Sequence, residues 1–185
     1  MSCDCEKWSS NALPYYAGEL SSGYRAYNDA VPGYGPAQFL VLGRQGRLRK
    51  EVAEQEGYAV FFLMPGHVGR VEGSSLVSTR WGRHFPYYTL DDRGGLVAHG
   101  DFAHGRPLTT LAYFFWSRSN LAERFAVSLP LRHTDDDYRL TATLLAESGR
   151  QAARQLHLRG FFVLLGPLAN RMMAGQLVSD LGIKR

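Results

Sequence analysis

The chain has 185 residues, of which 45% are hydrophobic and 21% charged, with a formal net charge of +4. This length suits one domain with a substantial core, and the composition excludes an intrinsically disordered chain. No apolar run approaches the ~20 residues that a membrane-spanning helix needs, and the N-terminus lacks the apolar core of a signal peptide. We therefore predict a cytoplasmic protein without a membrane partner.

The cysteines and the basic residues narrow the function classes further. Cys3 and Cys5 are too few for a closed four-ligand zinc site or for a disulfide framework. Arginine supplies most of the positive charge, and its densest cluster, in residues 44–50, is followed directly by Glu51 and Glu54. This pattern favours a solvated face over a nucleic-acid footprint.

Residues 1–36 differ in composition from the rest of the chain. They are rich in tyrosine, glycine and proline, which predicts an irregular N-terminal arm, with a single α/β domain over residues 37–185. We expect the arm to pack on its own domain. The alternative is an arm that reaches a neighbouring subunit and makes the protein a homo-oligomer.

The first half of the domain contains several apolar runs. We predict strands over 38–42, 58–64 and 75–81, and the second of these is a continuous apolar run typical of a buried strand. Periodicity leaves residues 47–56 open between a short helix and a polar strand.

A hairpin is the clearest local pattern in the middle of the chain. It covers residues 86–103, with its turn at 91–95. Residues 108–116 are compatible with a strand or a helix, and 121–124 with a helical turn. Alternating apolar residues predict a further strand over 125–131.

The last third reads as helix, strand and helix. Thr134 or Asp135 caps a helix that runs to about His157, in which Gly149 indicates close packing against another element. An apolar strand follows at 161–165, and a second helix over 168–181. The apolar positions of the two helices are Leu140, Leu144, Ala152, Leu156, Met173, Leu177 and Leu181.

The order of these elements predicts the fold class. A strand, a long helix and another strand in succession imply a parallel pair with a right-handed crossover, here between 125–131 and 161–165. We expect an α+β (mixed α/β) domain whose mixed, largely antiparallel sheet is covered by helices.

The elements from the hairpin onward resemble the acyl-CoA-dependent N-acetyltransferase (GNAT) superfamily. The resemblance is carried by the segment Arg159-Gly160-Phe161-Phe162-Val163-Leu164-Leu165, by Asn170, and by the closing Leu181-Gly182-Ile183-Lys184-Arg185. It implies a GNAT-like fold and transfer of an acyl group from acyl-CoA to the amine of a small molecule or a protein.

The same resemblance implies a set of cofactor-binding residues. Arg132, His133 and Arg139 would contact the phosphates of acyl-CoA, and Asn170 is the family-matched residue on the last helix. No catalytic residue and no metal ligand is assigned. A V-shaped split between 125–131 and 161–165 would mark the acyl-CoA cleft.

A second motif suggests metal chemistry. His99 and Asp101 form a His-x-Asp pair at the end of a predicted strand, followed by a segment somewhat similar to prolyl-hydroxylase-type oxygenases. Two histidines and one carboxylate hold non-haem Fe(II) with open positions. The second histidine would be His133 or His157.

The remaining alternative is a non-enzymatic binding or assembly protein. It ranks between the acyltransferase and the Fe(II)-dependent oxygenase, and it would bind a protein partner through the arm. Arginine together with exposed aromatic residues could also bind single-stranded nucleic acid, although no nucleic-acid motif is present. A nucleophile elbow, a P-loop and a dinucleotide fingerprint are likewise missing from the sequence.

Overall fold

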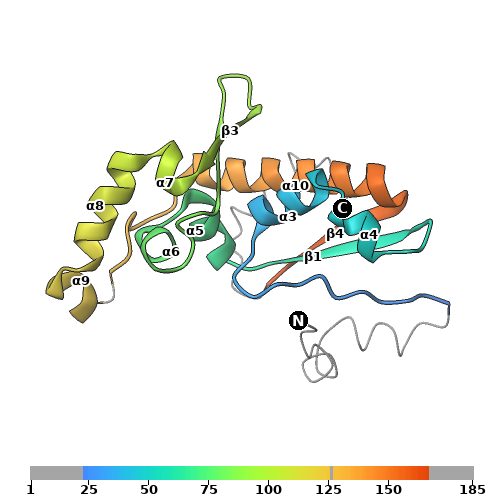
Figure 1. The fold of residues 1–185 in the computed structure, drawn as a ribbon, viewed down its shortest axis with the longest axis horizontal. Coiled ribbons are helices and arrows are strands. Elements are labelled where there is room, and N and C mark those ends of the chain that lie inside the picture. The colour runs from blue at the N-terminus through green and yellow to red at the C-terminus, as the bar shows by residue number, and fades with distance from the viewer. Residues whose placement is uncertain (1–22, 126, 167–185) are drawn as a thin grey trace.

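The computed structural model describes residues 23–125 and 127–166. This part of the chain is a mixed α+β structure with two separate two-stranded sheets, several short helices and one long helix, α10 (Asp135–Leu156) (Figure 1). The fold class is confirmed at this level. The prediction of one mixed sheet is wrong, because the parallel and antiparallel strands belong to different sheets.

The helix α10 begins at the predicted cap. Thr134 has extended backbone, and its hydroxyl accepts a hydrogen bond from the backbone N–H of Asp137 at 3.3 Å. In return the Asp137 carboxylate accepts from the backbone N–H of Thr134 at 2.7 Å. This reciprocal capping, with three acids in the first turn, suits the positive end of the helix dipole.

One side of α10 supplies buried residues to three apolar clusters. Its partners are α3 (Pro36–Arg44), α4 (Arg47–Glu51), α5 (Gly66–Glu72) and the strands of both sheets. The residues that α10 contributes are Leu140, Leu144, Ala142, Leu145, Ala152 and Leu156. The predicted apolar stripe is therefore confirmed for Leu140, Leu144, Ala152 and Leu156.

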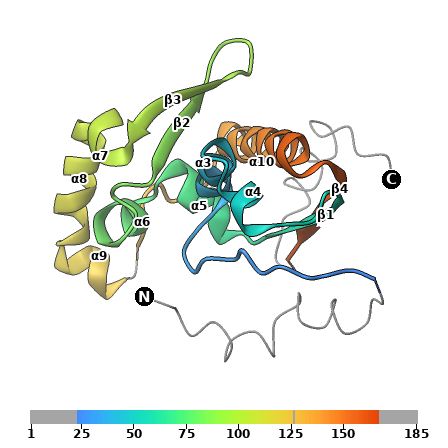
Figure 2. The ribbon, with the colours of Figure 1, turned by 45° about the vertical axis from the view of Figure 1, so that its right-hand side comes forward.

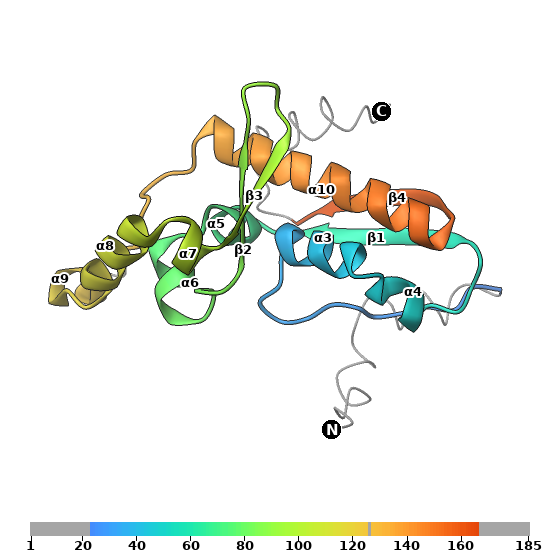
Figure 3. The ribbon, with the colours of Figure 1, turned by 45° about the horizontal axis from the view of Figure 1, so that its top comes forward.

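The parallel sheet pairs β1 (Gly57–Leu63) with β4 (Leu158–Leu165), and it lies beside the C-terminal half of α10 (Figure 3). Phe61 and Val163 pack toward the helix. The opposite face carries large apolar side chains that are 42–54% exposed, namely Tyr58, Val60, Phe62, Phe162 and Leu164. Strands are thus confirmed at 58–64 and 161–165. The parallel partner of β4 is β1, however, and not the predicted strand over 125–131.

The predicted strand over 125–131 is wrong, since none of the described residues 125 and 127–131 is in a strand. Their hydrogen bonds lead to a helix instead of a sheet. The Leu129 carbonyl accepts from the Ser75 backbone N–H at 2.7 Å, and the Leu129 N–H donates to the Ser75 hydroxyl at 2.8 Å. With these groups engaged at the start of a helix, and with Pro130 lacking an N–H, the segment cannot form a ladder.

Two other predicted strands, 38–42 and 75–81, are helices. In α3, Pro36 occupies the first turn, and the Gln38 side chain accepts from the Gly35 N–H at 2.9 Å. These residues cap the N-terminal end of the helix. In α6 (Ser75–Arg80), the Ser78 hydroxyl donates to the Ser74 carbonyl at 2.9 Å. The capping of α3 and the burial of residues in both helices override the apolar and β-branched composition.

The antiparallel hairpin of β2 (Pro86–Leu90) and β3 (Leu96–Asp101) is confirmed. It stands away from the parallel sheet, with the following helices at its base (Figure 2). These are α7 (Phe102–Gly105), α8 (Pro107–Ser117) and α9 (Asn120–Arg124). Of the segments that the sequence left open, 47–56 contains the helix α4, and 108–116 lies within the helix α8. The helical turn predicted at 121–124 is confirmed.

The described part of the N-terminal arm packs on its own domain. The Tyr34 ring meets the Phe85 ring edge-on at 6.2 Å, and the Tyr34 carbonyl accepts from Arg70 at 2.6 Å. The Tyr27 hydroxyl donates to Glu54 at 2.5 Å. Residues 1–22 and the predicted helix over 168–181 lie outside the described residues. Within the described ranges, no helix is both long and apolar enough to cross a membrane.

Gly149 of α10 allows a close contact between this helix and Phe161 of the parallel sheet. A Cβ atom at this position would lie 2.8 Å from Cδ1 of Phe161. We expect Gly149→Ala to destabilise the protein by about 1 kcal/mol in urea unfolding, because overpacking of ~1–3 kcal/mol outweighs a helix-propensity gain of ~1 kcal/mol.

The matched control is the same substitution in a Phe161→Val background, where the ring is absent. There Gly149→Ala should stabilise the protein. A stabilising effect of Gly149→Ala in the wild-type background would contradict the close contact.

His67 at the start of α5 generates a second expectation. The side chain is buried, and its Nδ1 accepts from the Met64 backbone N–H at 3.2 Å. Burial lowers the pKa of His67 to about 4, and Arg70 acts in the same direction. Because the unfolded chain binds this proton at higher pH than the native state, the free energy of unfolding should fall as pH drops from about 6.5 toward 4.

Between pH 7.5 and pH 5 this histidine should remove about 2 kcal/mol of stability. Urea unfolding of the wild type and of His67→Gln at both pH values measures the difference. Glutamine keeps an acceptor for the Met64 N–H but does not titrate. Equal losses of stability in the two proteins would exclude His67 as the cause.

Candidate functional site

Two clusters of titratable side chains are candidates for function. We call them the histidine–aspartate cluster, formed by His84, Asp101 and His104, and the buried glutamate cluster, formed by Glu72, His133 and Asp137. In each cluster one ligand-type atom per residue lies within 4.8 Å of the others. They are the groups of this kind found among the described residues.

The histidine–aspartate cluster is centred on the Asp101 carboxylate. His84 Nδ1 lies 2.9 Å from Asp101 Oδ2, and His104 Nδ1 lies 2.7 Å from Oδ1. Oδ1 also caps α7 by accepting from the backbone N–H of His104 at 2.8 Å. The imidazoles are open to solvent, with 71% and 80% of their side chains exposed, whereas the carboxylate is only 20% exposed.

Local backbone contacts explain why these three residues meet. Gly100 has a φ of +80°, which turns the chain where β3 ends and α7 begins. Phe102 is fully buried, and its N–H donates to the Phe85 carbonyl at 3.2 Å. The Ala103 N–H donates to the Arg83 carbonyl at 3.2 Å. These bonds hold residues 83–85 against the start of α7, which places His84 beside Asp101.

The electrostatics keep Asp101 ionised. The hydrogen bond with His84 holds the pKa of Asp101 well below its ordinary range, and the backbone and side chain of His104 act in the same direction. An ionised carboxylate flanked by two imidazoles is a set of three protein ligands for a divalent ion. The imidazole nitrogens approach different oxygens of the carboxylate, at 2.9 and 2.7 Å, and one ligand-type atom of each residue lies within 4.8 Å of the others.

The sequence identified Asp101 but not its partners. His99 points elsewhere, with Nε2 2.8 Å from the Thr89 hydroxyl on the neighbouring strand. His157 is the residue that ends α10, and His133 belongs to the other cluster. The spacing of Asp101 and His104, typical of a cap and the third helical residue, could have indicated His104. No local signal indicates His84, because its position depends on long-range packing.

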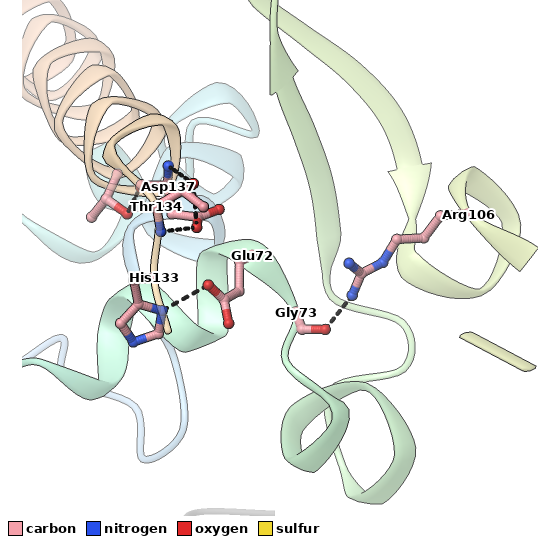
Figure 4. A network of polar contacts seen from close by, with 7 residues as sticks. Glu72, Gly73, Arg106, His133, Thr134 and Asp137 are labelled. Atoms are coloured by element: carbon pink, nitrogen blue, oxygen red, sulfur yellow. Dashed lines mark hydrogen bonds and ion pairs between the residues drawn. The ribbon is translucent and has the colours of Figure 1, made fainter. Parts of the chain in front are cut away.

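The buried glutamate cluster lies where the C-terminal end of α5 meets the N-terminal end of α10 (Figure 4). The Glu72 side chain is 5% exposed, and its Oε2 lies 2.7 Å from His133 Nδ1. Its other oxygen, Oε1, is buried and has no hydrogen-bond partner among the described residues. Asp137 adds a second carboxylate from the first turn of α10.

Burial dominates the electrostatics here. Burial raises the pKa of Glu72, whereas the hydrogen bond with His133 lowers it to a smaller extent. Arg106 approaches from the other side, where its guanidinium donates to the Gly73 carbonyl and lies 4.4 Å from the centre of the Phe102 ring (Figure 4). Burial lowers the pKa of Arg106 and raises that of Tyr113, whose ring also faces the guanidinium.

The structure does not show the residues predicted to bind acyl-CoA converging on one site. Arg132 is exposed, Arg139 lies 3.9 Å from Asp136, and His133 is bonded to Glu72. Asn170 lies outside the described residues. Because 125–131 is not a strand, the split expected between it and 161–165 does not form. Acyl-CoA binding by these residues stays a prediction.

The comparisons with known proteins do not assign this chain to a family. No family model matches this chain, and searches of curated proteins and of solved structures found no match either.

Proposed function

We propose that the protein is a metal-dependent enzyme that binds a divalent transition-metal ion at the histidine–aspartate cluster. The observation that carries this proposal is the approach of two imidazole nitrogens, at 2.9 and 2.7 Å, to the two oxygens of one carboxylate. Two histidines and one carboxylate with open positions suit non-haem Fe(II), so Fe(II) is the first ion to test.

The competing explanation is structural, with Asp101 serving only as the cap of α7. A cap needs one acceptor oxygen, and the His104 N–H already satisfies it at 2.8 Å. Holding two exposed imidazoles against the same carboxylate costs side-chain entropy and contributes little stability at a solvated surface. Their convergence is better explained by a ligand that binds all three groups.

The roles of the three residues follow from their surroundings. Asp101 supplies the negative charge, and its position is fixed by the backbone of α7. His84 and His104 would supply neutral nitrogens, and a bound ion would take the place of their present hydrogen bonds with the carboxylate. The exposure of both imidazoles leaves the outer side of the site open to water or substrate, where the ion would act as a Lewis acid.

The test is a titration of the full chain with Fe(II) under anaerobic conditions and with Co(II), whose visible spectrum reports ligand geometry. We expect stabilisation of ~2.7 kcal/mol in thermal unfolding at 100 times the dissociation constant. His84→Ala, His104→Ala and Asp101→Asn should each weaken binding at least about tenfold. Asparagine still caps α7, so Asp101→Asn removes the charge while keeping the helix start.

His99→Ala is the matched control, because His99 lies on the adjacent strand but contacts Thr89. It should bind the metal as the wild type does. Equal affinity in the wild type and in the double variant His84→Ala/His104→Ala would overturn the proposal. Acetyl-CoA belongs in the same thermal screen: stabilisation that Arg132→Ala and Arg139→Ala abolish would support the acyltransferase prediction instead.

A further inference from the structure

The buried glutamate cluster poses a separate problem of charge. Glu72 is the last residue of α5, at the negative end of the helix, and its side chain is 95% removed from solvent. A carboxylate is disfavoured both by burial and by this end of a helix. A buried carboxylate is normally paired through both oxygens.

His133 pairs with only one of the two oxygens of the Glu72 carboxylate. Its Nδ1 pairs with Glu72 Oε2 at 2.7 Å, and Oε1 is left without a partner among the described residues. Arg106, whose positive charge acts on Glu72, directs its guanidinium to the Gly73 carbonyl instead (Figure 4). The orphan oxygen therefore needs a positively charged or hydrogen-bonding ligand that the described side chains do not supply.

Asp137 increases this need. Its Oδ2 accepts from the backbone N–H and from the hydroxyl of Thr134, both at 2.7 Å, so the side chain is held in place. This brings a second carboxylate within 4.8 Å of Glu72 and His133. Two carboxylates at this separation repel each other unless a cation or a proton lies between them.

We propose that Glu72, Asp137 and His133 form a second divalent-cation site, independent of the histidine–aspartate cluster. Two carboxylates and one imidazole are an oxygen-rich ligand set. Carboxylates suit Mg²⁺, Ca²⁺ and Mn²⁺, and imidazole suits the transition metals, so Mn²⁺ satisfies both kinds of ligand. The cation would join the end of α5 to the start of α10.

The experiment is a Mn²⁺ titration of the chelator-treated full chain, followed by the loss of the electron paramagnetic resonance signal of free Mn²⁺. We expect Glu72→Gln to abolish one binding event and Asp137→Asn to weaken it at least about tenfold. Both substitutions preserve size, and asparagine can still accept from the Thr134 N–H. Thermal unfolding with and without Mn²⁺ supplies a second readout, since a purely structural role for Glu72 would not make the shift depend on Mn²⁺.

Asp136→Asn is the matched control, because Asp136 is a neighbouring acid whose side chain is 87% exposed. It should keep both the binding event and the Mn²⁺-dependent shift in melting temperature. A wild type whose Mn²⁺ binding is unchanged in Glu72→Gln and Asp137→Asn would overturn the inference, and the cluster would then be held by a proton. The double variant His84→Ala/His104→Ala separates the two proposals, because it should retain the event that Glu72→Gln removes.

Discussion

The structure depends on the burial of one side of α10. Leu144 and Leu145 are fully buried, and they lie in different apolar clusters that join the helix to both sheets. Each two-stranded sheet is too small to bury its own apolar side chains, so its stability requires packing against a helix. The helix α3 also packs against α10, and the Ser148 hydroxyl of α10 lies 3.4 Å from the Pro36 carbonyl of α3. Loss of the α10 packing would therefore separate all three clusters at once.

The N-terminal end of α10 extends this role from packing to chemistry. The cap fixes Thr134, and the preceding residue, His133, consequently lies over α5, with Cε1 of its ring 3.7 Å from the position of a Cβ on Gly69. On the far side of α5, Gly73 has a φ of +65°, and a Cβ there would meet the Arg106 guanidinium and the Phe102 ring. Because Phe102 directly follows Asp101, the end of α5 packs against a residue next to the histidine–aspartate cluster.

The sequence predicted the elements whose signals are local and strong. The cap at Thr134, the stripe of α10, the close contact at Gly149 and the apolar run of β1 all have a period or a boundary that needs no tertiary information. The errors came from apolar segments whose surroundings decided the outcome. Residues 38–42 became a helix because a cap and packing outweighed composition, and 75–81 because packing did. The described residues of 125–131 do not form a strand, since Leu129 hydrogen-bonds to Ser75. For the same reason Asp101 was found from sequence but His84 was not.

The different burial of the two clusters argues for different uses of a metal ion. With both carboxylates ionised and its imidazole neutral, the buried glutamate cluster would carry two negative charges, and a dication would bring it to zero. Neutralisation matters most for Glu72, whose side chain is removed from water, because an uncompensated buried charge is strongly destabilising. The histidine–aspartate cluster carries one negative charge, so a dication there would leave one positive charge at a solvated surface. That residual charge can attract an anionic ligand or polarise water, which makes the exposed cluster the better place for chemistry and the buried cluster the better place for a structural ion.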